Sequence, residues 1–145
     1  MNTVTITGSK ELQAALAALG SELEAVTRDA VNATGLELRS DIVKRYQRGP
    51  KSGRIYKRRG VTHQASAPGE APATDTGRLV ASVVFEDDML NGIPSVSIVS
   101  RLAIAAYLEF GTMQIAPRPA WVPAAQAITP KFQKRLEAAI KRATA

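Results

Sequence analysis

The fold class follows from residues 81–99, which read Ala81-Ser-Val-Val-Phe-Glu86, then Asp87-Asp-Met-Leu-Asn91-Gly-Ile-Pro94, then Ser95-Val-Ser-Ile-Val99. The first run is rich in β-branched and apolar residues, and the last alternates polar with apolar residues at the period of a half-buried strand. Asn91-Gly92 between them is typical of a hairpin turn. These residues predict an antiparallel hairpin whose connection is longer than two residues.

Upstream of the hairpin, leucines recur at spacings of three and four and form an apolar stripe on one helical face: Leu12, Leu16, Leu19, Leu23 and Val26. Gly20 suits the position just past a helix end, and Ser21 with Glu24 forms a capping-box pattern. We therefore expect a short helix, a tight corner at Gly20-Ser21 and a long helix over residues 22–47. Gly35 within that helix costs about 1 kcal/mol relative to alanine. The buried face continues through Ala30, Leu38, Ile42 and Tyr46.

Helical patterns also follow the hairpin. Residues 103–110 predict a short helix with Gly111 past its end. A final helix is expected to begin near Pro123, with Pro130 either kinking it or restarting it with Thr129 as the cap. Before the hairpin, Thr74-Asp75 is expected to cap a helical turn that runs through Leu79.

The N-terminal segment Thr3-Val-Thr-Ile-Thr7 alternates polar and apolar β-branched residues and predicts a further strand. Strands and helices that do not alternate as βαβ units indicate an α+β fold. We expect one domain over residues 1–145: a small antiparallel sheet, formed by the N-terminal strand and the hairpin, packed with the long N-terminal helix and the C-terminal helix.

Regular periodicity stops between residues 48 and 74, where Gly and Pro are frequent. A loop of this length inside a compact domain is uncommon and is usually functional or disordered. We expect residues 48–74 to be a long extended loop without regular elements, mobile in the isolated chain.

Composition argues against an enzyme. The 145 residues include no cysteine and one histidine, His63, which removes thiolate chemistry and His-rich metal sites. His63 with Asp75 or Glu70 could be imagined as a catalytic dyad, but no nucleophile motif accompanies them. Asp87-Asp88 is typical of solvated turn residues. We predict no catalytic residue, no cofactor and no metal. No apolar run is long enough to cross a bilayer, so we expect no membrane contact and synthesis in the cytoplasm.

The net charge of +6 is concentrated in one block. Residues 1–43 carry three Lys/Arg against six Asp/Glu, whereas residues 44–60 carry eight basic residues and no acid. The block could dock on acidic surfaces of neighbouring subunits, contact DNA phosphates without sequence preference, or simply be solvated. Besides Arg54, its members are the candidate DNA or acidic-partner contacts: Lys44, Arg45, Arg48, Lys51, Lys57, Arg58 and Arg59.

Several segments in a fixed order carry a family resemblance. They are an amphipathic helix with a basic end, a Gly/Arg-rich loop, Ser66-Ala-Pro-Gly-Glu-Ala-Pro72 running into Asp75-Thr-Gly-Arg-Leu79, a hairpin, Tyr107-Leu-Glu-Phe-Gly-Thr112, Arg118-Pro119 and a C-terminal helix. Over residues 10–142 the chain resembles the siphophage neck and tail-component family typified by gene product ten of a lambda-like phage. More distantly it is similar to tail-completion and virion-morphogenesis proteins. It differs in having Ala120 and Trp121 after the Arg-Pro, where the family usually has an aromatic and then an aliphatic residue.

The resemblance implies a structural virion protein without catalysis, assembled in the bacterial host cytoplasm. Its implied place is a homo-oligomeric ring of six copies in the neck or tail region, around the DNA conduit. Its implied partners are a head-side connector or stopper and a tail tube or tail terminator protein. A small basic nucleic-acid-binding protein that acts through residues 44–60 is the alternative.

The resemblance also implies that residues 48–77 form an arm laid across a neighbouring subunit. From the residues themselves, Phe110 is expected to be core, Glu109 to pair with Arg118, and Trp121 to be a packing anchor. The candidate subunit contacts are Arg54, Tyr56, His63, Pro68, Glu70, Pro72, Asp75, Arg78, Tyr107, Glu109, Phe110, Arg118 and Trp121.

Overall fold

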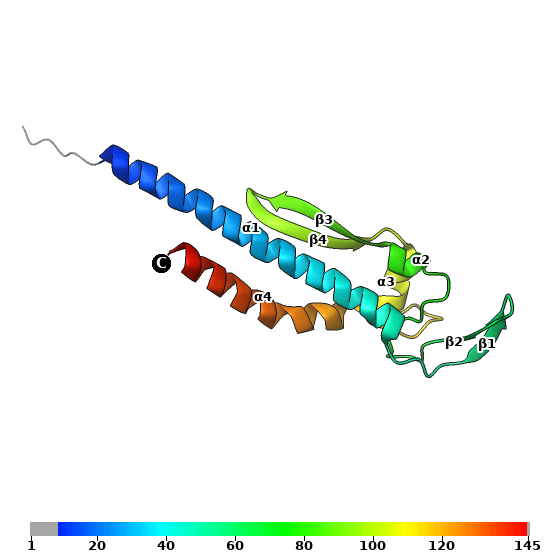
Figure 1. The fold of residues 1–145 in the computed structure, drawn as a ribbon. Coiled ribbons are helices and arrows are strands. Elements are labelled where there is room, and N and C mark those ends of the chain that lie inside the picture. The colour runs from blue at the N-terminus through cyan, green and yellow to red at the C-terminus, as the bar shows by residue number, and fades with distance from the viewer. Residues whose placement is uncertain (1–8, 145) are drawn as a thin grey trace, which may run out of the picture.

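The computed structural model describes residues 9–144, so the strand expected at residues 3–7 lies outside the described range. The fold is α+β, with two separate two-stranded antiparallel sheets, a long N-terminal helix and a C-terminal helix (Figure 1). In chain order the elements are α1 Ser9–Arg48, β1 Ile55–Arg58, β2 Val61–Gln64, α2 Arg78–Ala81, β3 Val83–Leu90, β4 Ile93–Ser100, α3 Ala103–Phe110 and α4 Trp121–Ala143.

The first helix is a single element of 40 residues, about 60 Å long at 1.5 Å per residue. The corner expected at Gly20-Ser21 is therefore wrong. The Ser21 hydroxyl donates to the carbonyl of Ala18 at 2.8 Å, as an interior helical serine does, and does not cap a new helix. Alanines and leucines on both sides favour the helix strongly enough to carry it through the glycine.

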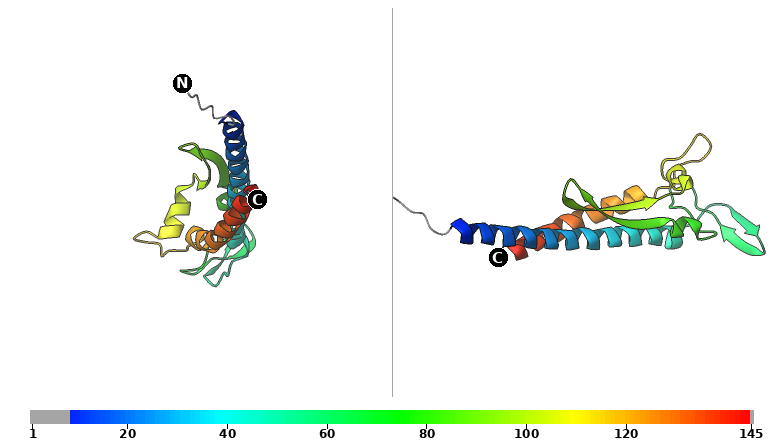
Figure 2. Two further views of the ribbon diagram at one scale, coloured as in Figure 1. Left: turned by 90° about the vertical axis from the view of Figure 1, so that its left-hand side faces the viewer. Right: turned by 90° about the horizontal axis from the view of Figure 1, so that it is seen from above.

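Residues 48–74 contain a regular hairpin, so the expectation of no regular element there is wrong. Strands β1 and β2 pair in register from Ile55↔Gln64 to Arg58↔Val61. Arg59 and Gly60 form the two-residue turn, with φ of 53° and 79°, which are the positive values that a type I′ turn requires at both positions. From here on we use the name arm for residues 53–65 alone, which are the projecting part of the segment 48–77. It projects past the C-terminal end of α1 (Figures 1 and 2).

The hairpin β3–β4 is confirmed, but its connection is shorter than expected. Leu90 pairs with Ile93, so only Asn91 and Gly92 link the strands, and both have positive φ. The strand expected to end at Glu86 continues to the turn. Asp87-Asp88 therefore lies in strand β3 and not in a turn.

The three other helices agree with the predicted ranges more closely than with the predicted caps. Helix α3 coincides with residues 103–110, followed by Gly111. Helix α4 runs without interruption through Pro130, and the Thr129 hydroxyl donates to the carbonyl of Ala125 at 2.8 Å instead of capping a second helix. The short helix α2 begins after Gly77, which makes no side-chain cap, so Thr74 and Asp75 do not cap it.

Helix α1 packs against both α4 and the hairpin β3–β4. Helix α4 runs back along it in the opposite direction, and the hairpin β3–β4 lies along another side (Figures 1 and 2). The core lies near the C-terminal end of α1 and consists of Ile42, Tyr46, Val83, Ala120 and Ala124. An ion-pair cluster links the two long helices, in which Glu37 receives hydrogen bonds from Lys131 at 2.6 Å and Arg135 at 2.9 Å. These bonds hold the pKa of Glu37 below its usual value.

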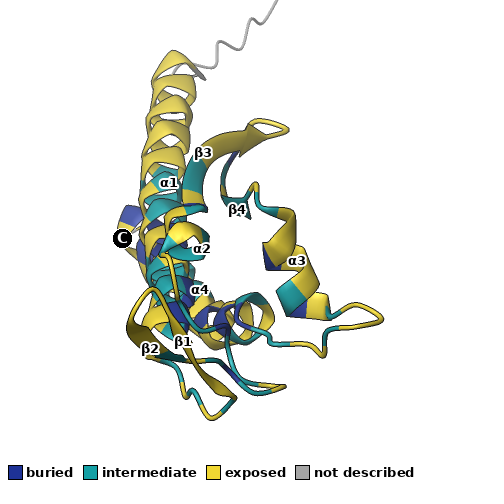
Figure 3. Cartoon of the chain, turned by 90° about the vertical axis from the view of Figure 1, so that its right-hand side faces the viewer, coloured by how far each residue is buried: buried dark blue, intermediate teal, exposed yellow. Residues whose placement is uncertain are grey.

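The leucine stripe at the start of α1 is not buried. Leu12 and Leu16 are 60% and 59% exposed, and the first turns of α1 extend beyond the neighbouring elements (Figure 3). Only from about Ala30 does the predicted face become core. Within residues 9–144 no helix combines the length and apolar character needed to cross a bilayer.

The hairpin packs closely against α1 at Gly35. A Cβ atom added there would lie 2.5 Å from Val96 Cγ1 and 2.9 Å from Phe85 Cε2. Such distances require the packed side chains of Val96 and Phe85 to shift. The interpretation of Gly35 as a mere helical weakness is therefore incomplete, because its missing side chain lets the sheet pack on the helix.

We predict that Gly35→Ala lowers the free energy of unfolding by about 1–3 kcal/mol, the usual cost of overpacking. The matched control is Gly20→Ala, since a Cβ at Gly20 meets nothing within 4 Å. That control should raise the free energy of unfolding by up to about 1 kcal/mol through helix propensity alone. Urea denaturation measures both. Equal stabilisation by the two substitutions would contradict the close approach of the hairpin.

Candidate assembly interface

We call the C-terminal end of α1, around Tyr46, the hub, because the arm and α3 both lie beside it (Figure 1). Tyr46 is 1% exposed there, and its hydroxyl accepts a hydrogen bond from Trp121 Nε1 at 2.7 Å. Burial raises the pKa of Tyr46 above its ordinary value. Trp121 also packs against the core cluster, so its indole joins the start of α4 to the end of α1.

Glu109 caps α4 from a neighbouring helix. Its carboxylate accepts hydrogen bonds from the backbone N–H groups of Ala120, Trp121 and Val122 at 2.7, 3.0 and 2.8 Å. The first N–H groups of a helix have no partner within it, and a carboxylate placed there also complements the helix dipole. Glu109 is 8% exposed, so this buried charge is satisfied entirely by α4.

The expected Glu109–Arg118 pair is therefore wrong. Arg118 donates its backbone N–H to the carbonyl of Leu108 at 2.6 Å, and its buried Nε has no hydrogen-bond partner. The expected burial of Phe110 is also wrong, because that side chain is 73% exposed. Helix α3 is apolar on several sides and stands away from α1 (Figure 3), so only part of it is covered.

Helix α3 and the loop after it form an exposed apolar surface. We call this surface the α3 end, and its members are Ile104, Tyr107, Phe110 and Met113. Apolar side chains gathered in this way on a monomer are typical of a contact with another molecule.

Glu70 fastens the base of the arm. It accepts hydrogen bonds from the Ser52 N–H at 2.9 Å and the Ala67 N–H at 2.8 Å, and from the Ser52 hydroxyl. These bonds lower the pKa of Glu70, with the hydroxyl contributing most. Gly53 lies against the carbonyls of Ala65 and Ser66, where a Cβ would be within 2.8 Å of both oxygens. The arm therefore leaves the body through two closely apposed strands.

A second set of bonds joins the arm base to the hub. The ammonium of Lys51 donates to the carbonyls of Ala71 and Pro72 at 2.9 and 3.0 Å. Partial burial lowers the pKa of Lys51. The Thr74 hydroxyl donates to the carbonyl of Tyr46 at 3.0 Å.

The basic block divides into two groups. Arg45 pairs with Asp41 and Arg58 with Asp75, so with Lys51 three of the eight cations bind their own chain. Among residues 9–144 no ion pair involves the others, and all of them are exposed: Lys44, Arg48, Arg54, Lys57 and Arg59.

His63, Asp75 and Glu70, from which a catalytic dyad could be imagined, each contact other residues. His63 lies edge-on to the Tyr56 ring at 5.1 Å between centroids, Asp75 binds Arg58 and Glu70 binds Ser52 and Ala67. No group of three His, Asp or Glu side chains that could hold a metal ion occurs among residues 9–144. Of the remaining candidates, Pro72 is buried in the arm base, while Pro68 and Arg78 are exposed.

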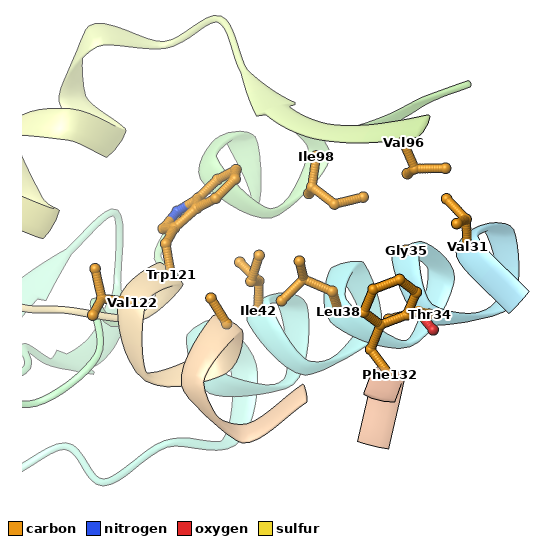
Figure 4. Close-up of a pocket in the computed structure, with 11 residues that line it drawn as sticks. Val31, Thr34, Gly35, Leu38, Ile42, Val96, Ile98, Trp121, Val122 and Phe132 are labelled. Carbon is orange, nitrogen blue, oxygen red and sulfur yellow. The ribbon is translucent and has the colours of Figure 1, made fainter. Parts of the chain in front are cut away.

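An open apolar groove of about 390 Å³ runs along α1 between β4 and α4 (Figure 4). Val31, Leu38 and Ile42 form its floor, Val96 and Ile98 of β4 one wall, and Trp121, Val122, Ala125 and Phe132 of α4 the other. No charged side chain lines it. The groove exists because the hairpin and α4 pack on α1 far more than on each other.

Sequence reasoning missed this groove and the bond between Tyr46 and Trp121, but its predictions that Tyr46 is buried and that Trp121 is a packing anchor are confirmed. Gly35, Val96 and Phe132 carry no motif, and the Tyr46–Trp121 bond joins residues 75 positions apart. One signal for the role of Glu109 was available. The predicted helix over residues 103–110 ends at Gly111, and a proline-rich segment then leads into the next helix. Such a junction needs an N-cap, and Glu109 is the acid nearest to it.

Comparisons with protein-family models, with curated proteins and with solved structures find no match to this chain. Functional interpretation therefore rests on its own residues and geometry.

We predict that Glu109→Gln lowers the free energy of unfolding by about 2–3 kcal/mol, because an amide cannot replace a carboxylate that accepts three buried N–H groups. Glu137→Gln on the exposed face of α4 is the matched control and should change stability by less than about 0.5 kcal/mol. Urea denaturation followed by tryptophan fluorescence measures both. A neutral Glu109→Gln would show that the cap is dispensable.

For the arm base we predict that Glu70→Gln leaves the fold intact but speeds tryptic cleavage after Lys57, Arg58 and Arg59 severalfold at pH 7. Glu137→Gln on the exposed face of α4 is again the control and should leave the rate unchanged.

The lowered pKa of Glu70 fixes the sign of its pH dependence. Its anchoring contribution is complete above its ordinary pKa of 4.5 and is lost as pH falls through the lower folded value. The amide resonances of Ser52 and Ala67 should titrate together with a midpoint below 4.5. A midpoint at or above that value would refute the anchoring role.

Proposed function

We propose that this protein is a structural subunit of a tailed-phage virion, acting in head–tail joining or tail completion and not as an enzyme. Copies associate in a ring in the neck or tail region, around the DNA conduit, with six as the number implied by the family resemblance. The neighbours are a head-side connector or stopper and a tail tube or terminator protein.

One observation carries the proposal: a small core supports several uncovered contact surfaces at separate places. These are the arm, the α3 end, the exposed start of α1 and the open groove. A protein that works alone has little use for so much exposed apolar surface, whereas a subunit with neighbours on both sides does. The order of motifs from residue 10 to 142 supports the same assignment.

The arm suits this role because its bonds hold its base and leave its tip clear. Ile55 and Val61 are exposed on it beside Lys57 and Arg59. A surface that combines apolar and basic side chains matches an acidic protein patch with an apolar centre, which is the usual composition of a subunit contact.

Nucleic-acid binding is the second candidate, favoured by Arg54, Lys57 and Arg59 on the projecting arm. Phosphate contacts of this kind would be independent of sequence and weakened by salt. Lys51 and Arg58 are engaged within the chain, so a test of DNA binding should leave both unchanged.

The test replaces Ile55–Gln64 by two glycines, which is feasible because the Ala65 N–H already donates to the Arg54 carbonyl at 3.0 Å. The shortened protein should still melt cooperatively. In the phage that encodes it, loss of the gene should yield filled heads and separate tails, the full chain should restore joined particles, and the armless chain should not. Electron micrographs of the lysates give the answer.

A control variant with Arg54→Ser, Lys57→Ser and Arg59→Ser keeps the arm and removes its three exposed charges that form no ion pair among residues 9–144. If this variant loses duplex DNA binding in solution, and particles join without the protein, the nucleic-acid function is correct and the virion proposal fails.

A further inference from the structure

The open edge of β4 borders the groove and carries no charged side chain. The hairpin has two strands, so β4 has one edge with no partner among the described residues. No charged residue occurs in β4, whereas β3 carries Glu86, Asp87 and Asp88. Charged residues and proline are common protections of an edge strand, and an edge without them is a template for another strand. The one proline of β4, Pro94, lies beside the turn, so residues 95–100 carry neither protection. Only β4 of the two strands lines the groove.

A strand added to this edge would lie over the groove, between β4 and α4. Strands in a sheet are about 4.8 Å apart, and successive side chains point to opposite faces. Every second residue of the added strand would thus enter the groove and meet Val96, Ile98 and Phe132. The occupant must be a short, uncharged segment that alternates apolar and polar residues. It would also turn a two-stranded hairpin into a three-stranded sheet, which is the smallest that is normally stable.

The chain contains one such segment outside the described residues. Thr3-Val-Thr-Ile-Thr7 is uncharged and places Val4 and Ile6 on one side and three threonines on the other.

This segment cannot reach the groove of its own copy. The groove begins at Val31, about 33 Å along α1 from Ser9. Ile6 is three residues from Ser9 and Thr3 is six, so an extended chain takes them at most about 11 and 21 Å from it. The direction of α1 also carries the N-terminus away from the hairpin (Figure 1).

We infer that residues 3–7 of one copy pair with the edge of β4 in a second copy, inserting Val4 and Ile6 into the groove between β4 and α4. The contact is heterologous, because the donor and acceptor surfaces differ, and such contacts propagate into rings or open chains. The inference names a subunit contact for the assembly proposed above and rests on that proposal only in requiring that copies associate.

The test compares two double variants of the full chain. Val4→Asp with Ile6→Asp places charge on the groove side, and Thr3→Asp with Thr5→Asp places the same charge in the same segment on the opposite side. Sedimentation equilibrium measures mass, and hydrogen exchange measures protection of the β4 amides of Val96 and Ile98. These two face the open edge, because Leu90 and Ile93 form the hydrogen-bonded pair beside the turn and pairs alternate along the hairpin. Neither change touches the described core, so folding is preserved.

The natural chain and the threonine variant should both exceed the 15.5 kDa of one copy and protect β4. The Val4/Ile6 variant should sediment as a single copy, with β4 exchange at least tenfold faster. A synthetic peptide of residues 1–9, added to that variant, should restore protection without restoring the larger mass.

Three outcomes overturn the inference. A natural chain of one-copy mass with a protected β4 would place the strand in its own copy, after a break in α1. Association with a rapidly exchanging β4 would assign the contact to another surface such as the α3 end. An unaffected Val4/Ile6 variant would exclude the segment. If copies associate through residues 3–7 and β4 but the protein is absent from virions, the inference stands and the proposed function fails.

Discussion

Packing against one helix constrains the rest of this molecule. Both the hairpin β3–β4 and α4 pack against the middle of α1, and the missing side chain of Gly35 lets the hairpin pack closely there. The two layers do not close over each other, so an apolar groove stays open between them. At the C-terminal end the Tyr46–Trp121 bond and the Glu109 cap draw α1, α3 and α4 together. The arm and α3 are held from that junction, whereas the exposed start of α1 lies at the opposite end of the helix (Figure 1).

The elements that the sequence predicted well are those whose signals are local. Alternation with an Asn-Gly turn predicted β3–β4, and a compact apolar run ended by glycine predicted α3. Three predictions failed, for different physical reasons. The capping pattern at Ser21 implies a turn, but the surrounding alanines and leucines outweigh it. The glycines and prolines of residues 48–74 suggested a loop, whereas Arg59-Gly60 is a tight hairpin turn. The leucines of early α1 have helical spacing, yet no described element reaches them to bury them.

The candidate interface was less accessible to sequence reasoning because burial and partners depend on tertiary structure. Phe110 and Trp121 are both aromatic residues near helix ends, and only the fold makes one exposed and the other packed. The basic block looked uniform, but carbonyls and acids of the same chain engage Lys51, Arg45 and Arg58. What distinguishes a structural cation from an exposed one is the position of its neighbours, which a linear pattern does not contain.

The attachment of the arm has a mechanical consequence. At the base of the arm, Lys51 donates to the carbonyls of Ala71 and Pro72, and the Ser52 N–H donates to Glu70. The nearby Thr74 hydroxyl donates to the carbonyl of Tyr46. Tyr46 in turn holds Trp121 at the start of the C-terminal helix. A force applied to the tip would thus travel through short polar links into both long helices at once. Tension on the arm would load the same tyrosine that secures the core, so the attachment of the arm and the stability of the body are coupled.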